Sequence, residues 1–115
     1  MSWTLKVRDR FSAAHFLREY KGKCEKVHGH TFQVEAVISV SELDKSGLGI
    51  DFTLIKTKLA EILPDHSLLN ETYDFNPSAE NLARRFYFDL KPHFPVRAVT
   101  VWESEDASAT FTEDR

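Results

Sequence analysis

The stretch HTFQVEAVISVS, residues 30–41, decides the fold. Apolar side chains recur at every second position from 32 to 40, and this period of two is typical of a strand with one buried face. Residues 3–17 alternate in the same way, and a turn signal, DKSG, stands at 44–47. We therefore expect two long strands that lie side by side and run antiparallel.

Two segments in the middle of the chain change to the helical period. In residues 52–63 the apolar side chains lie three or four positions apart, Asp51 is a possible N-cap, and Pro64 ends the run. Residues 78–91 carry a clearer apolar stripe. The preceding Asn76-Pro77-Ser78 offers either an asparagine cap with proline at the first helical position or a serine cap. Both segments are predicted to be helices.

The end of the chain returns to the strand pattern at 96–103 and 107–112. The predicted order is β-β-α-α-β-β, without an internal repeat or a low-complexity stretch. Such an order predicts an α+β fold, an antiparallel sheet with two helices on one face. A length of 115 residues is usual for one domain, so residues 1–115 are expected to form a single domain.

Composition excludes several classes of protein. Hydrophobic residues at 42% and charged residues at 29% are ordinary globular values. A net charge of -3 argues against a general nucleic-acid surface, and no apolar run is long enough for a membrane span or a signal peptide. The single cysteine, Cys24, excludes an internal disulfide. We expect a soluble, cytoplasmic protein that binds neither nucleic acid nor membranes.

The triplet His28-Gly29-His30 is the strongest chemical signal. Strand residues two apart point to the same face, so both imidazoles can reach one ion. His15 is the natural third candidate, because it ends a strand that could pair with the second one. Catalytic zinc usually takes three protein ligands and keeps one open position. The alternative is that these histidines meet by chance, at the surface or in the core.

Other candidate residues have more than one interpretation. Cys24, four residues before His28, could be a fourth zinc ligand, a base or nucleophile activated by nearby cations, or an inert core residue. Asp65 beside His66 could be a proton-relay pair, although such pairs are also common in loops. Glu103 ends an apolar strand and either lies at a solvated edge or holds a ligand with paired N–H donors.

A cupin interpretation also fits part of the spacing. His28, His30 and Glu35 would form a site of two histidines and one carboxylate, typical of an iron oxygenase. Two features oppose it. Glu35 has the opposite strand parity from the histidines, and two helices occupy a region where a jelly roll needs strands.

Taken together, the motifs resemble the 6-pyruvoyl-tetrahydropterin synthase / 6-carboxytetrahydropterin synthase family over nearly the whole chain. The similar segments are FSAAHFL (11–17), CEKVHGHTF (24–32), GIDF (49–52), DHSLLN (65–70), PSAENLA (77–83) and VWE (101–103). The resemblance implies a tunnelling fold (T-fold), in which subunits join their sheets into a barrel, typically a hexamer of two trimers with active sites between subunits.

The same resemblance assigns roles to the candidate residues. It implies zinc on His15, His28 and His30, the pterin ring on Glu103, the catalytic base at Cys24, and the proton relay at Asp65 and His66. The substrate it implies is 7,8-dihydroneopterin triphosphate.

The product implied by the resemblance depends on two neighbouring residues. Cys24 followed by the His-Gly-His triplet resembles the enzymes that form 6-carboxy-5,6,7,8-tetrahydropterin, acetaldehyde and triphosphate for queuosine or archaeosine synthesis. A 6-pyruvoyl-tetrahydropterin synthase is the alternative. Glu25 stands where a folate-related member of the family carries glutamate in place of the cysteine, so 6-hydroxymethyl-dihydropterin is a further product, unless Glu25 is only a solvated charge. A pterin-binding relative without turnover is opposed by the intact Cys24, Asp65 and His66.

Overall fold

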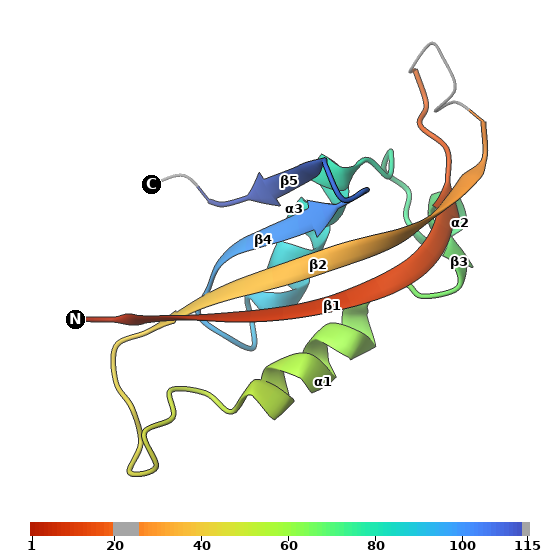
Figure 1. Cartoon of the computed structure of the whole chain (residues 1–115). Coiled ribbons are helices and arrows are strands. Elements are labelled where there is room, and N and C mark those ends of the chain that lie inside the picture. Colours follow the sequence, from red (N-terminus) through yellow and green to blue (C-terminus); the bar gives the residue numbers. More distant parts are fainter. Residues whose placement is uncertain (20–25, 114–115) are drawn as a thin grey trace.

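A computed structural model describes residues 1–19 and 26–113. In chain order the elements are β1 (Trp3–His15), β2 (His28–Val40), α1 (Phe52–Ile62), β3 (Ser67–Leu68), α2 (Leu69–Thr72), α3 (Ala79–Leu90), β4 (Val96–Trp102) and β5 (Ser108–Phe111). The strands form one sheet in the order β3-β1-β2-β4-β5 (Figure 1). Only the short β3 runs parallel to its neighbour, and the other pairs are antiparallel.

The α+β class, the four predicted strands and the two predicted helices are confirmed. The difference lies between the two predicted helices, where the chain forms β3 and the four-residue α2. Elements of two and four residues are too short to show a period of apolar residues, so the sequence predicts neither. Ser78 caps α3 by accepting a hydrogen bond from the Asn81 N–H, which settles the choice between the two predicted caps. Asp51 caps α1, as predicted.

The long pair of β1 and β2 sets the position of the rest of the molecule. Its register is unbroken from Trp3 opposite Val40 to His15 opposite His28. In the middle, Phe11 and Phe32 stack with ring centroids 4.8 Å apart. The helices α1 and α3 cover the face that carries these rings (Figure 1), and the apolar stripe of α3 is buried there. One contiguous core of buried side chains lies between the sheet and these helices.

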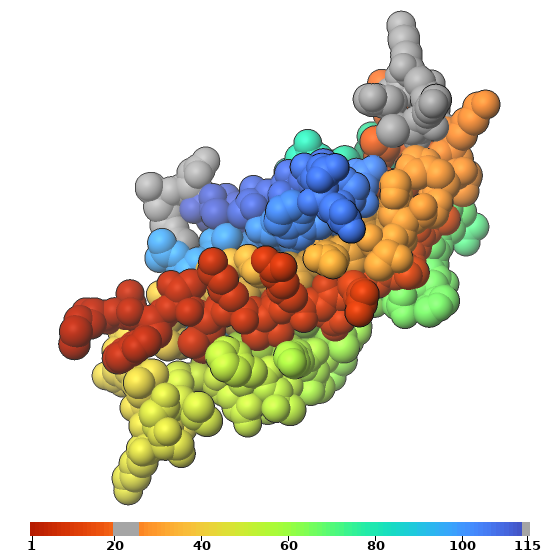
Figure 2. Space-filling view, viewed as in Figure 1, coloured from red at the N-terminus to blue at the C-terminus, as the bar shows by residue number. Residues whose placement is uncertain are grey.

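The opposite face of the sheet is polar. Arg8 on β1 forms a 2.8 Å ion pair with Glu35 on β2, and Thr100 shares a 2.7 Å hydrogen bond with Thr110. Figure 2 shows β1 running uncovered along the front of the molecule. Because Glu35 lies on this face, it points away from the buried face that carries the histidines, and the cupin interpretation is wrong. No helix in residues 1–19 or 26–113 is both long enough and apolar enough to span a membrane.

Candidate metal centre

The strand register gathers the three predicted histidines. His15, the last residue of β1, is paired with His28, the first residue of β2. The ring centroids of His15 and His28 lie 4.6 Å apart. The His30 ring lies 4.6 Å from that of His28 and 5.2 Å from that of His15. The predicted grouping of these histidines is therefore present in the structure.

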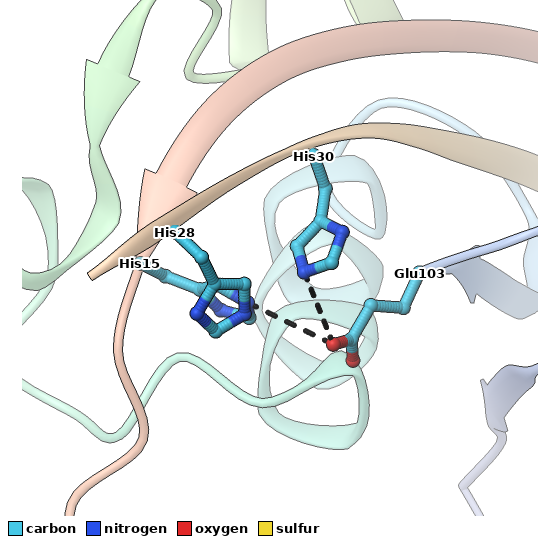
Figure 3. Close-up of side chains that lie close together, drawn as sticks. All are labelled: His15, His28, His30 and Glu103. Carbon is cyan, nitrogen blue, oxygen red and sulfur yellow. Dashed lines mark ion pairs between the residues drawn. The ribbon is translucent and has the colours of Figure 1, made fainter. Parts of the chain in front are cut away.

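Glu103 completes a cluster of four. It follows directly after β4, and the alternation along that strand directs it to the same face as the buried Val101. Its Oε1 lies 3.4 Å from His30 Nε2 and 3.8 Å from His15 Nε2 (Figure 3). One ligand atom from each of the four residues can be chosen so that all lie within 4.8 Å of one another. This arrangement could hold a metal ion.

Backbone carbonyls orient two of the imidazole rings. His15 Nδ1 donates to the Pro77 carbonyl at 2.8 Å, and His28 Nδ1 donates to the Lys26 carbonyl at 2.7 Å. With the proton on Nδ1, the lone pair is on Nε2, which is the arrangement seen when a ligating histidine is fixed by an outer hydrogen bond. Both rings are thus prepared to bind an ion through Nε2.

Two buried nitrogen atoms have no hydrogen-bond partner among the described residues. They are His15 Nε2 and His30 Nε2. Buried polar atoms are nearly always hydrogen-bonded, so an unsatisfied pair facing one point needs an explanation. Three imidazoles and a carboxylate are suitable ligands for zinc. The donor set and the two unsatisfied atoms therefore fit a metal ion.

Burial lowers the pKa of His15 and of His30, because the charged imidazolium is less well solvated inside the protein. The carboxylate of Glu103 acts in the opposite direction, but burial dominates at both histidines. The neutral ring is the form that binds a metal. At neutral pH these two rings are accordingly in the competent state.

The metal-free protein should lose stability as the pH falls below 6.5, the ordinary histidine pKa. The unfolded chain then binds protons that the folded histidines still exclude, so this part of the stability is present above that pH and is lost below it. Thermal unfolding of metal-stripped protein at about pH 7.5 and about pH 5.5 measures the effect. His15→Asn keeps a donor for the Pro77 carbonyl and should show a smaller difference in thermal midpoint between the two pH values. An equal difference in both proteins would show that His15 is not a source of the pH dependence.

The predicted Asp65–His66 pair is formed. His66 Nδ1 and Asp65 Oδ2 are 2.8 Å apart, and Asp65 Oδ1 accepts from the Ser12 N–H at 2.8 Å. The Ser12 hydrogen bond is the largest of the effects that lower the pKa of Asp65. His66 has a φ of 55° and donates its own N–H to the Ser12 carbonyl at 2.7 Å. Few residues other than glycine occupy this left-handed region, so the backbone holds His66 in an uncommon conformation.

An open hollow of about 470 Å³ lies beside His30 and His66. It is lined by parts of β1, β2 and the start of β3, and both His30 and His66 contribute to its wall. A ligand in this hollow could touch His30 and His66 together.

Cys24 and Glu25, the other predicted catalytic residues, lie outside the described residues.

Three residues at this site were not assigned a role from the sequence. Pro77 supplies the carbonyl that orients His15, and the side chains of Asn70 and Asn76 hold the backbone just beyond His15. Asn70 and Pro77 fall within segments that resemble the family, and the sequence indicates Asn76 only as a possible helix cap. Hydrogen bonds from side chains to distant backbone follow no sequence period, so no signal pointed to them.

Comparison with known proteins identifies the family. Residues 4–114 match the 6-pyruvoyl tetrahydropterin synthase family. The chain belongs to this family. A putative 6-carboxy-5,6,7,8-tetrahydropterin synthase of Archaeoglobus fulgidus is 41% identical over 103 residues, covering 87% of this chain and 87% of that protein. The 6-carboxy-5,6,7,8-tetrahydropterin synthase of Bacillus subtilis is 37% identical over 100 residues, covering 80% of this chain and 68% of that protein.

Solved structures of 6-pyruvoyl tetrahydropterin synthases have the same fold. The Caenorhabditis elegans protein superposes with a TM-score of 0.87 at 25% identity, covering 99% of this chain and 97% of that one. The Plasmodium falciparum protein gives a TM-score of 0.76 at 19% identity, covering 97% and 98%. The predicted tunnelling fold is confirmed for the subunit.

Proposed function

We propose that this chain is a zinc-dependent lyase that converts 7,8-dihydroneopterin triphosphate, with water, to 6-carboxy-5,6,7,8-tetrahydropterin, acetaldehyde and triphosphate. The cluster of His15, His28, His30 and Glu103, with its two unsatisfied Nε2 atoms, carries the proposal. The names of the Archaeoglobus fulgidus and Bacillus subtilis relatives favour the 6-carboxy product. The pathway would be the synthesis of queuosine or archaeosine.

In this proposal the three histidines hold the zinc ion. A bound zinc ion supplies Lewis acidity, which makes hydroxyl and adjacent C–H groups of a bound side chain easier to deprotonate. Cys24 takes a proton from the substrate side chain, and His66 returns one at another atom. Asp65 holds the His66 ring through its 2.8 Å contact. His66 is 84% exposed in the single subunit, which leaves it open to a substrate.

The Glu103 carboxylate occupies two different positions in this proposal. In the proposed complex its carboxylate accepts from the ring N–H and the amino group of the pterin, a two-point contact that fixes the side chain over the metal. Without a ligand the carboxylate lies against His30 and His15. We propose that substrate binding draws Glu103 from the histidines to the pterin ring.

Glu103→Gln should weaken pterin binding roughly tenfold to a hundredfold, because hydrogen bonds to a charged group contribute about 1.5–3 kcal/mol. Titration of zinc-loaded protein with 7,8-dihydroneopterin measures the affinity. Glu105→Gln alters an exposed carboxylate two residues away and serves as the matched control. If Glu103→Gln loses zinc but binds the pterin as well as the parent does, Glu103 is a metal ligand only.

The decisive assay is incubation of purified, zinc-loaded protein with 7,8-dihydroneopterin triphosphate and identification of the products. Appearance of 6-carboxytetrahydropterin and acetaldehyde supports the proposal. Accumulation of 6-pyruvoyl-tetrahydropterin alone would assign the chain to the biopterin-type branch. No turnover, with pterin still bound, would indicate a binding protein.

A dual activity through Glu25 is the second candidate. The descriptions of two Plasmodium vivax 6-pyruvoyltetrahydropterin synthase structures name a glutamate as a catalytic residue, there replaced by cysteine or by alanine. This chain carries cysteine and glutamate side by side at positions 24 and 25. Formation of 6-hydroxymethyl-dihydropterin that disappears in Glu25→Gln would establish the dual activity.

We also propose that the chain assembles into a hexamer of two trimers in a reducing, cytoplasmic compartment. The sheet ends at β5 on one side and at β1 with the two-residue β3 on the other, so both edges have backbone groups available for further pairing. A thiol that acts as a base must stay reduced, which suits such a compartment. Light scattering on the purified protein tests the mass of the assembly.

A further inference from the structure

One edge of β1, continuing past its end, is hydrogen-bonded by residues 65–76, here called the edge segment. Ser12 meets Asp65 and His66 at the start of this segment. Ala13 and Ala14 then pair with β3. β1 ends at His15, yet hydrogen bonding to the edge segment goes on at residues 16 and 18.

Two asparagine side chains make these last contacts. Asn70 Oδ1 accepts from the Phe16 N–H at 2.9 Å, and Asn70 Nδ2 donates to the Phe16 carbonyl at 3.0 Å. Asn76 does the same for Arg18, at 2.9 Å and 3.2 Å. A carboxamide has both a donor and an acceptor, so each asparagine satisfies the N–H and the C=O of one residue, as a neighbouring strand would.

The far end of the edge segment is itself fixed to α3. The Asn76 carbonyl accepts from the Ser78 N–H at 2.8 Å and from Asn81 Nδ2 at 2.9 Å. The next residue, Pro77, supplies the carbonyl that orients the His15 ring. Adjacent residues therefore hold the backbone at Arg18 and the ring of His15, and both are tied to the N-terminus of one helix.

His15 is the histidine most dependent on this support. Its ring is fully buried, and its Nε2 has no hydrogen-bond partner among the residues that the structure describes. On its N-terminal side the backbone is fixed by β2 and β3. On its C-terminal side, strand pairing among the described residues ends at His15 itself, and the contacts of Asn70 and Asn76 take its place.

We propose that Asn70 and Asn76 are positioning residues of the metal centre. They hold the chain beyond His15 so that its Nε2 faces His30 and Glu103, and they thereby raise the affinity for the ion. Groups that hydrogen-bond a metal ligand directly typically change metal affinity 10–100-fold, and Asn70 and Asn76 act one step further out, so the lower end of that range is expected. The inference rests on the metal site of the proposed function and adds two residues to it.

The test is the metal affinity of Asn70→Ala and Asn76→Ala, measured on metal-stripped full chain. Zn²⁺ and Co²⁺ are titrated against a chromophoric chelator, at a temperature where circular dichroism shows each variant folded. Each variant should bind both ions about tenfold more weakly, and the visible spectrum of bound Co²⁺ should change as the His15 ligand loosens. If an alanine variant does not fold, serine at the same position keeps a small polar group and should show the same loss.

Thr100→Val is the matched control. It removes the 2.7 Å hydrogen bond to Thr110 on the opposite face of the same sheet. It should change the thermal midpoint but leave the affinity and the Co²⁺ spectrum as in the parent. If the asparagine variants behave like this control, their role is structural only and the inference is wrong. If the parent protein binds neither ion, the proposed metal site itself is wrong. This result differs from one in which the parent binds the ions and only the positioning role is wrong.

Discussion

His30→Ala should reduce turnover of 7,8-dihydroneopterin triphosphate at least roughly a thousandfold. A bound metal ion contributes several kcal/mol of charge stabilisation, and about 1.4 kcal/mol corresponds to tenfold in rate. The variant should fold, because the His30 side chain is 27% exposed and its Nε2 is hydrogen-bonded to none of the described residues. Steady-state kinetics measure the turnover, and the metal content of the same sample shows whether the ion is lost.

The matched control for this variant is His93→Ala. His93 lies just beyond α3 and belongs neither to the four-residue cluster nor to the Asp65–His66 pair. It should keep the metal content and turnover of the parent. Retention of more than about a tenth of the activity in zinc-loaded His30→Ala would exclude an essential metal role for this ring, since the expected loss is two orders of magnitude larger.

Cys24→Ala should lower turnover roughly 10²- to 10⁴-fold, the usual contribution of a positioned general base. Unlike His30→Ala, it should leave the metal content unchanged, because the cluster in the described residues already offers three imidazoles and a carboxylate. The measurement is kcat beside zinc content and the binding of 7,8-dihydroneopterin. Unchanged pterin binding with lost turnover locates the defect in proton transfer.

Loss of zinc in Cys24→Ala would instead favour the fourth-ligand interpretation of this cysteine. Full turnover with full zinc content would exclude both roles and would leave Glu25, three residues before His28 in the sequence, as the candidate base. These outcomes separate the alternatives that the sequence left open.

The sequence predicted the long elements and the histidines well because both depend on simple periods. Alternation places His28 and His30 on one face, and the end of β1 brings His15 opposite them. The position of Glu103 among the histidines depends on the register between β2 and β4, with Gln33 opposite Trp102. Such a register is set by packing over the whole sheet and cannot be read from one segment.

The edge segment shows a second limit of prediction from the sequence. Asn70 and Asn76 act on backbone more than fifty positions earlier, through single side chains. Local sequence reasoning treats asparagine as a turn or cap residue, since those are its common short-range roles. The elements between them, β3 and α2, are too short to carry a period. Only the folded chain brings these residues to the metal centre.

The pairing of β1 with β2 has a consequence for how the protein matures. A slip of one residue between β1 and β2 would turn the side chains of one strand to the opposite face relative to its partner. His15 would then lie away from His28 and His30, and the three rings could not bind one ion. The metal would therefore select the correctly aligned chain, and would add about 2.7 kcal/mol to its stability at a free concentration one hundred times the Kd. With zinc as the proposed ion, we expect proteases to clear the chain sooner in a zinc-starved cell than in a zinc-replete one.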